Sequence, residues 1–230
     1  MMNIVLINIC SGQVAILLLV FGDQLAEEDL HMSIDGAINM SNISNINNSK
    51  NFYGLNFGLG LHIKVNDHWQ LNPQFRPLSQ KGYSNAEPII EIPSELSNDN
   101  TILKFNYIEV PIMMRYNISE RMFASAGPQV SFLTSAKQIT TGKYTNDREG
   151  TLELDAKKHF NTVTLGLPVE LGYWLRFTNK KTTSVLKLVL FARYCPDLTS
   201  AFKNGNAKNS TLQFGLSFPV IKEHKNEQIF

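Results

Sequence analysis

The chain has 230 residues and a formal net charge of +1, which argues against nucleic acid as the main partner, because nucleic-acid binding needs a concentrated basic surface. Hydrophobic residues make up 43% of the chain, yet no segment reaches the roughly 18–20 consecutive apolar residues of a membrane helix. A membrane β-barrel is not excluded by this test, because only alternate residues of its strands face lipid.

The chain begins with an expected signal peptide at residues 1–22. Its apolar core is Val14–Phe21, and Gly22 follows as a small residue suited to cleavage. The segment contains no Lys or Arg, which departs from the usual signal peptide, and a buried or membrane helix is the alternative interpretation. Residues 23–30 form an acidic linker before the expected barrel at residues 31–220, and residues 221–230 form a C-terminal tail.

Alternating apolar and polar residues predict eight β-strands. They are expected at residues 31–40, 52–66, 69–82, 102–116, 122–138, 159–176, 184–195 and 210–220. The connections alternate long and short, with residues 139–158 as one of the long loops. This rhythm predicts an all-β fold, an eight-stranded antiparallel up-and-down transmembrane β-barrel, with short turns on the periplasmic side and long loops outside the cell.

The clearest strand pair is the hairpin whose turn lies at Asn117–Arg121. In its first arm, Ile108, Val110, Ile112 and Met114 share an apolar face that we expect to meet lipid. In its second arm the same alternation predicts that Ala136 faces outward and that Lys137 faces inward. Strand aromatics stand near predicted strand ends, as an interfacial girdle requires. They are Tyr53, Trp69, Tyr116, Tyr173 and Tyr194.

Charged residues on the opposite strand faces predict a polar network inside the barrel. Its members are expected to be Arg76, Glu109, Arg115, Glu170, Lys187 and Arg193. Arg76 and Glu109 lie at similar distances from turns on the same side, so we predict that they form an ion pair, with Glu170 and Arg193 as a second pair. Bulky inward side chains predict a filled interior and no open pore.

The residues of this hairpin resemble the PorT-like small outer-membrane β-barrel domain family of Gram-negative bacteria. The resembling residues are Tyr107, Glu109, Pro111, Gly127, Pro128 and Gln129, with Ser79–Gly82 and Ser135–Lys137 similar as well. The resemblance implies a location in the bacterial outer membrane, with lipid as the surroundings. Some members of the family are associated with protein secretion, so secretion or envelope proteins are candidate partners. The barrel-insertion machinery is a further partner, for which Phe218 or Phe230 would supply the terminal aromatic residue.

No catalytic, cofactor or metal site is expected. The five histidines stand outside any nucleophile motif, Cys10 and Cys195 do not have metal-ligand spacing, and Cys195 is expected to be a small packing residue. One alternative is a soluble lipocalin-like barrel that binds a small apolar ligand, in which the two strand faces are reversed. Another is a barrel enzyme that modifies lipids. Glycines and charges of both signs on one face favour the membrane barrel, since charged residues that face lipid are costly.

Overall fold

The computed structural model describes residues 29–46, 48–85, 87–93, 96–97, 100–145, 148–178 and 185–221. The expected signal peptide, most of the linker and the tail after Ile221 lie outside these residues. No helix in the described ranges is long and apolar enough to cross a membrane.

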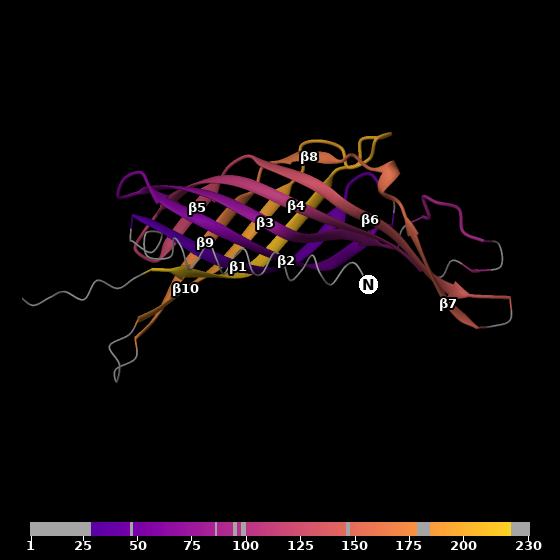
Figure 1. Ribbon diagram of the computed structural model, residues 1–230, viewed down its shortest axis with the longest axis horizontal. Coiled ribbons are helices and arrows are strands. Elements are labelled where there is room, and N and C mark those ends of the chain that lie inside the picture. Colours follow the sequence, from indigo (N-terminus) through magenta and orange to yellow (C-terminus); the bar gives the residue numbers. More distant parts are fainter. Residues whose placement is uncertain are drawn as a thin grey trace, which may run out of the picture.

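The described residues form eleven strands and one short 3₁₀ helix. Figure 1 shows how these elements are arranged. They are β1 (Leu30–Ile43), β2 (Lys50–Lys64), β3 (Trp69–Ser84), β4 (Asn100–Asn117), β5 (Met122–Ala126), β6 (Gln129–Lys143), β7 (Glu149–Asp155), η1 (Lys157–His159), β8 (Val163–Gly166), β9 (Val169–Thr178), β10 (Val185–Pro196) and β11 (Asn209–Val220).

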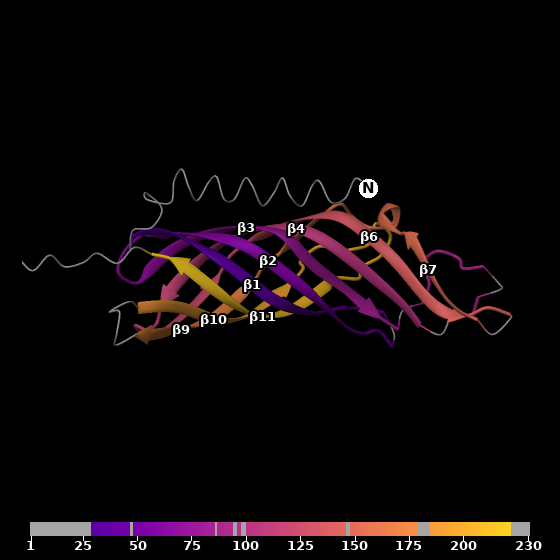
Figure 2. The ribbon, with the colours of Figure 1, turned by 60° about the horizontal axis from the view of Figure 1, so that its bottom comes forward.

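The strands close into an antiparallel ring of eight positions. The first four strands occupy consecutive places, β5 with β6 fills the fifth, β8 with β9 fills the sixth, and β11 pairs back onto β1. In Figure 2, β3 and β4 run along one side of this ring and β9, β10 and β11 along the other. Pairing of β7 with β6 extends a hairpin beyond the body of the barrel (Figure 1). The predicted all-β, eight-stranded barrel is confirmed.

The two ends of the barrel differ in their connections. The first residue of β1 and the last of β11 lie at the end with the short turns, here called the inner end, and the long loops lie at the outer end. Residues 139–158, expected to form a loop, instead contain the end of β6 and all of β7. His159, expected to begin a strand, lies in η1.

Two neighbouring barrel strands are interrupted at the same level by a proline in each. Gly127–Pro128 separates β5 from β6, and Leu167–Pro168 separates β8 from β9. Proline has no N–H to continue a ladder, and the Gly127 N–H instead donates to the Pro168 carbonyl at 3.3 Å. A Cβ at Gly127 would lie 1.9 Å from the Ile112 carbonyl oxygen, so the close approach of β4 requires glycine. The expected uninterrupted strands at 122–138 and 159–176 were therefore wrong at these points.

A β-bulge reverses the faces of β6 near its outer end. The pairing with β4 changes from Tyr107–Leu133 to Asn106–Ser135, which leaves one extra residue, Thr134, on β6. As a result Ala136, predicted to face outward, is buried, and Lys137, predicted to face inward, is exposed and paired with Glu153.

Apolar side chains cover the outside of the barrel. On β4, Ile112 and Met114 are 47% and 42% exposed, whereas the intervening Met113 is fully buried. The same alternation exposes Tyr53, Tyr116, Tyr173 and Tyr194, and the Trp69 and Tyr116 rings lie 4.9 Å apart near the inner end. These are the faces of a membrane barrel, because a lipocalin-like barrel would have the apolar face inside.

Candidate functional site

The barrel interior, here called the lumen, holds buried charges of both signs. Among the described residues these are four cations and four carboxylates, each at most 4% exposed: Arg76, Lys81, Arg115, Arg193, Asp35, Glu109, Glu170 and Asp197. An unpaired buried charge is costly, so the equal numbers allow the lumen as a whole to remain neutral. Their arrangement divides them into an inner and an outer cluster.

The inner charge cluster contains Asp35, Arg76, Arg115, Glu170 and Arg193. Arg193 and Glu170 are direct cross-strand partners, and the Arg193 Nε donates to Glu170 Oε2 at 2.9 Å, as the sequence suggested. Arg76 Nη2 lies 3.5 Å from Asp35 Oδ2. Gln74 joins the two pairs, because its Oε1 accepts from both Arg76 Nε and Arg193 Nη2 at 3.0 Å.

The outer charge cluster contains Lys81, Glu109 and Asp197. Lys81 Nζ lies 2.7 Å from Glu109 Oε1 and 3.8 Å from Asp197 Oδ1. Arg76 and Glu109 are register partners on β3 and β4, but the ion pairs are Arg76 with Asp35 and Glu109 with Lys81. The predicted Arg76–Glu109 pair is therefore replaced by two others.

The sequence pattern missed Lys81 because the phase of β3 changes between Arg76 and Ser79. Before this irregularity the inward residues have even numbers, and after it they have odd numbers, so Lys81 turns into the lumen. The nearby Pro77, which cannot donate to the ladder, was the signal that this strand is irregular. Lys187, expected in the lumen network, instead lines a cavity at the inner end and is partly exposed.

The family-motif residues gather around the interrupted strands. Pro111 lies opposite Gln129 in the β4–β6 pairing, and the Ile112 N–H donates to the Pro128 carbonyl at 2.9 Å. Buried Gln129 donates to Ser131 Oγ at 3.0 Å and accepts from the Cys195 thiol at 3.5 Å. Tyr107 is also buried, with its ring 5.3 Å from Lys81 Nζ. In this arrangement the motif shapes the barrel wall and lines its outer half.

An apolar cap closes the outer half of the lumen. Its buried members are Ile43, Tyr83, Leu103, Phe105, Tyr107, Leu133, Ala136, Ala156, Phe160, Ala201 and Ala207. Phe160 connects barrel to loop, with its ring 4.7 Å from Phe105 and 4.6 Å from Phe202. Asn161 Nδ2 fixes the loop by donating to the carbonyls of Ser200 and Phe202, both at 2.9 Å.

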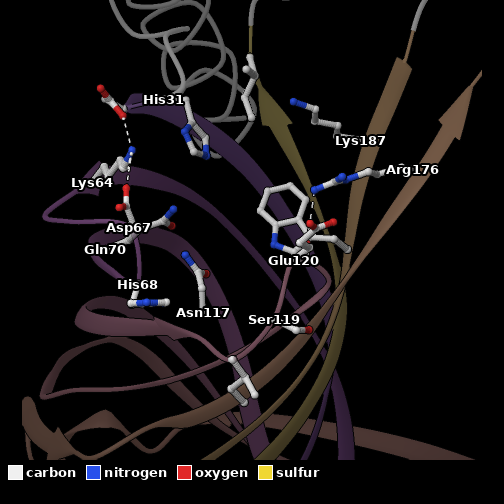
Figure 3. A pocket seen from close by; sticks show the side chains of 14 residues that line it. His31, Lys64, Asp67, His68, Gln70, Asn117, Ser119, Glu120, Arg176 and Lys187 are labelled. Atoms are coloured by element: carbon white, nitrogen blue, oxygen red, sulfur yellow. Dashed lines mark hydrogen bonds and ion pairs between the residues drawn. The ribbon is translucent and has the colours of Figure 1, made fainter.

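A polar cavity of about 440 Å³, here called the vestibule, opens at the inner end (Figure 3). Its lining residues come from several strands and turns: Asp29, His31, Lys64, Asp67, His68, Gln70, Asn117, Ile118, Ser119, Glu120, Trp174, Arg176, Lys187 and Ile221. The His31 ring stacks on His62 with centroids 4.6 Å apart, and His62 Nε2 lies 3.0 Å from Ser33 Oγ. His31 thus links the vestibule lining, through His62 and Ser33, to Asp35 of the inner charge cluster.

A closed antiparallel barrel with an apolar outside and a charged, filled lumen defines the class of integral outer-membrane β-barrel proteins. The model of the family described as "Outer membrane protein beta-barrel domain" matches residues 23–203, and this chain belongs to that family. Its location is the bacterial outer membrane. The inner end of the barrel is accordingly the periplasmic end, and the outer end faces the exterior.

Solved outer-membrane proteins resemble the chain at low identity. Ail, the attachment invasion locus protein of Yersinia pestis, shows 15% identity and a TM-score of 0.41, covering 84% of this chain and 99% of its own. Neisserial surface protein A shows 13% identity and a TM-score of 0.40, and the match covers 83% of this chain and 97% of its own. The outer membrane protein OprG from Pseudomonas aeruginosa shows 10% identity and a TM-score of 0.37, and the match covers 86% of this chain and 98% of its own. No protein of curated function matches the sequence significantly.

Proposed function

We propose that this protein is a closed, non-enzymatic outer-membrane barrel with a structural or accessory role in the envelope. The observation that carries the proposal is the filled lumen. Arg76 and Arg193, the two largest fully buried side chains among the described residues, cross the inner half with Gln74 between them. The apolar cap fills the outer half, so a solute entering the vestibule meets two successive barriers.

A Ser–His pair in the lumen does not have the hydrogen bonding of a nucleophile and its base. Ser33 Oγ donates to Asp35 Oδ1 at 3.0 Å, and an ionised carboxylate can only accept. The single hydroxyl proton of Ser33 is therefore directed at Asp35 and not at His62 Nε2, which also lies 3.4 Å from the Asn72 amide nitrogen. Ser33 is also fully buried. This arrangement supports a structural role and disfavours the lipid-modifying alternative.

Planar-bilayer recording tests the closed barrel. Purified folded protein should give no steady conductance, whereas a known porin inserted in the same bilayers serves as the positive control. A separate control for folding is the change in gel mobility between unheated and heated protein. A stable porin-like current from folded protein would refute the closed-barrel proposal.

We further propose that the protein belongs to the PorT-like branch and meets secretion or envelope proteins through its long outer loops and periplasmic rim. The motif around Tyr107–Gln129 supports this assignment by resemblance. Cross-linking in intact cells from cysteines placed at exposed Leu198 in an outer loop and exposed Glu120 at the rim would identify neighbours. Recovery of barrel-insertion proteins alone, with secretion unchanged after deletion of the gene, would contradict a secretion role.

A further inference from the structure

We propose that the vestibule binds a small oxyanion, a carboxylate or phosphate group from the periplasm, on the guanidinium of Arg115. Arg115 lies in the lumen near the inner end of β4 and is 4% exposed. Three observations support the site: the uneven distribution of lumen charge, hydrogen-bond donors on Arg115 without partners, and its position beside the vestibule.

The lumen charges balance in total but not in each cluster. In the outer charge cluster, one cation, Lys81, faces two carboxylates, Glu109 and Asp197. In the inner charge cluster, three arginines share two carboxylates, Asp35 and Glu170. The inner cluster therefore carries one surplus positive charge, on the side of the lumen that leads to the periplasm.

The surplus charge lies on Arg115. Glu170 Oε2 accepts from Arg193, and Glu170 Oε1 accepts from Ser125 Oγ at 3.0 Å. Arg115 Nη2 is 3.8 Å from that second oxygen, which is beyond hydrogen-bonding distance. Arg115 Nε and Nη1 have no hydrogen-bond partner in the described part of the chain. A buried guanidinium with unused donors is costly, so a bound anion would be favoured there.

The register places Arg115 beside the vestibule. It pairs across the strands with Gln70, which lines the cavity and has a buried Oε1 without a partner among the described residues. The Arg115 guanidinium lies 3.7 Å above the Phe123 ring, and Phe123 pairs with the vestibule residue Asn117. The charged end of Arg115 thus leans toward the periplasmic mouth.

Basic residues nearer the rim are engaged with partners. Lys64 lies 3.3 Å from both Asp29 and Asp67, and Arg176 Nη2 donates to the Glu120 carbonyl at 3.4 Å (Figure 3). These contacts leave the deeper Arg115 as the preferred anion site. A planar guanidinium presents two parallel N–H groups, which match the geometry of a carboxylate or a phosphate.

Calorimetric titration of the folded full-length protein in detergent micelles tests the site. Inorganic phosphate and acetate are the probes, in a buffer of low ionic strength. Wild type should bind at least one of them saturably, and Arg115→Gln should weaken that binding about tenfold or more, because charge-assisted hydrogen bonds are lost. Arg121→Gln is the matched control: it removes the same charge from a turn residue that is exposed where Arg115 is buried, and binding should be unchanged.

The relative affinity for the two probes identifies the ligand as a phosphate or a carboxylate. If Arg115→Gln does not fold, Arg115→Lys keeps the charge and removes the paired donors. The arginine Nε–H resonance missing from the Arg115→Lys spectrum should then be the one that shifts when the anion is added to wild type. Absence of saturable binding in wild type, equal binding by wild type and Arg115→Gln, or an unshifted Arg115 resonance would overturn the proposal.

Discussion

The Lys81–Glu109 ion pair makes a quantitative prediction for stability. Its charged atoms lie 2.7 Å apart, and both side chains are fully buried. Removal of one partner from such a pair typically costs about 3–5 kcal/mol. Glu109→Gln should fall near the lower value, about 3 kcal/mol, because Lys81 keeps Asp197 at 3.8 Å. Lys81→Gln should approach about 5 kcal/mol, because it leaves Glu109 and Asp197 without their cation.

The double variant should be less unstable than the two single effects added together. Once Lys81 is replaced, Glu109→Gln no longer takes a partner from a buried cation, so the second change should cost only about 0–1 kcal/mol. We expect a coupling free energy of about 2–3 kcal/mol, at the upper end for contacting residues. Urea titrations of unfolding in lipid vesicles can measure the wild type, both single variants and the double variant.

The exposed Lys137–Glu153 pair is the matched control for this cycle. Its side chains are 47% and 51% exposed, so water screens the charges and the coupling should be below about 1 kcal/mol. The coupling free energy of Lys81 with Glu109 should be clearly larger than that of Lys137 with Glu153. Additive effects of Lys81→Gln and Glu109→Gln, or a coupling no larger than that of Lys137 with Glu153, would show that burial does not strengthen the lumen pair as argued.

Two further predictions concern the barrel wall. Val110→Arg should destabilise the barrel by about 2–4 kcal/mol near the membrane midplane, whereas Val110→Leu should be nearly neutral; an equally stable Val110→Arg would place this face away from lipid. Gly127→Ala should lower the urea midpoint strongly, because its Cβ would lie 1.9 Å from the Ile112 carbonyl oxygen. Gly36→Ala is its control, because nothing lies within 4 Å of a Cβ there, and equal midpoints for the two alanine variants would contradict the close approach.

The fold was predictable from the sequence because most strands keep a strict alternation. On β9 and β10 the alternation continues without a shift, and it correctly placed Glu170 and Arg193 opposite each other in the lumen. The strand count followed from the same pattern. Alternation alone did not distinguish a membrane barrel from a lipocalin-like barrel, because both have one apolar and one polar face.

The details of the lumen were less predictable because single-residue irregularities reverse every side chain beyond them. The change in β3 brought Lys81 inside, and the bulge at Thr134 exchanged Ala136 with Lys137. Such irregularities depend on how two strands fit together in space. Proline gives a partial signal, as at Pro77 and Pro128, but Thr134 has no comparable mark in the sequence.

A narrow membrane barrel explains why so many charges are buried together. Lipid requires apolar residues at alternate positions, so polar residues occupy the other positions, and in eight strands their side chains meet across the lumen. Each inward charge must then find a partner, as Arg193 does with Glu170 and Lys81 with Glu109. Arg115, which shares an already engaged carboxylate, is the cross-strand partner of the vestibule residue Gln70. Incomplete pairing at the periplasmic end is tolerable to the fold, and it is also what an anion-binding site requires.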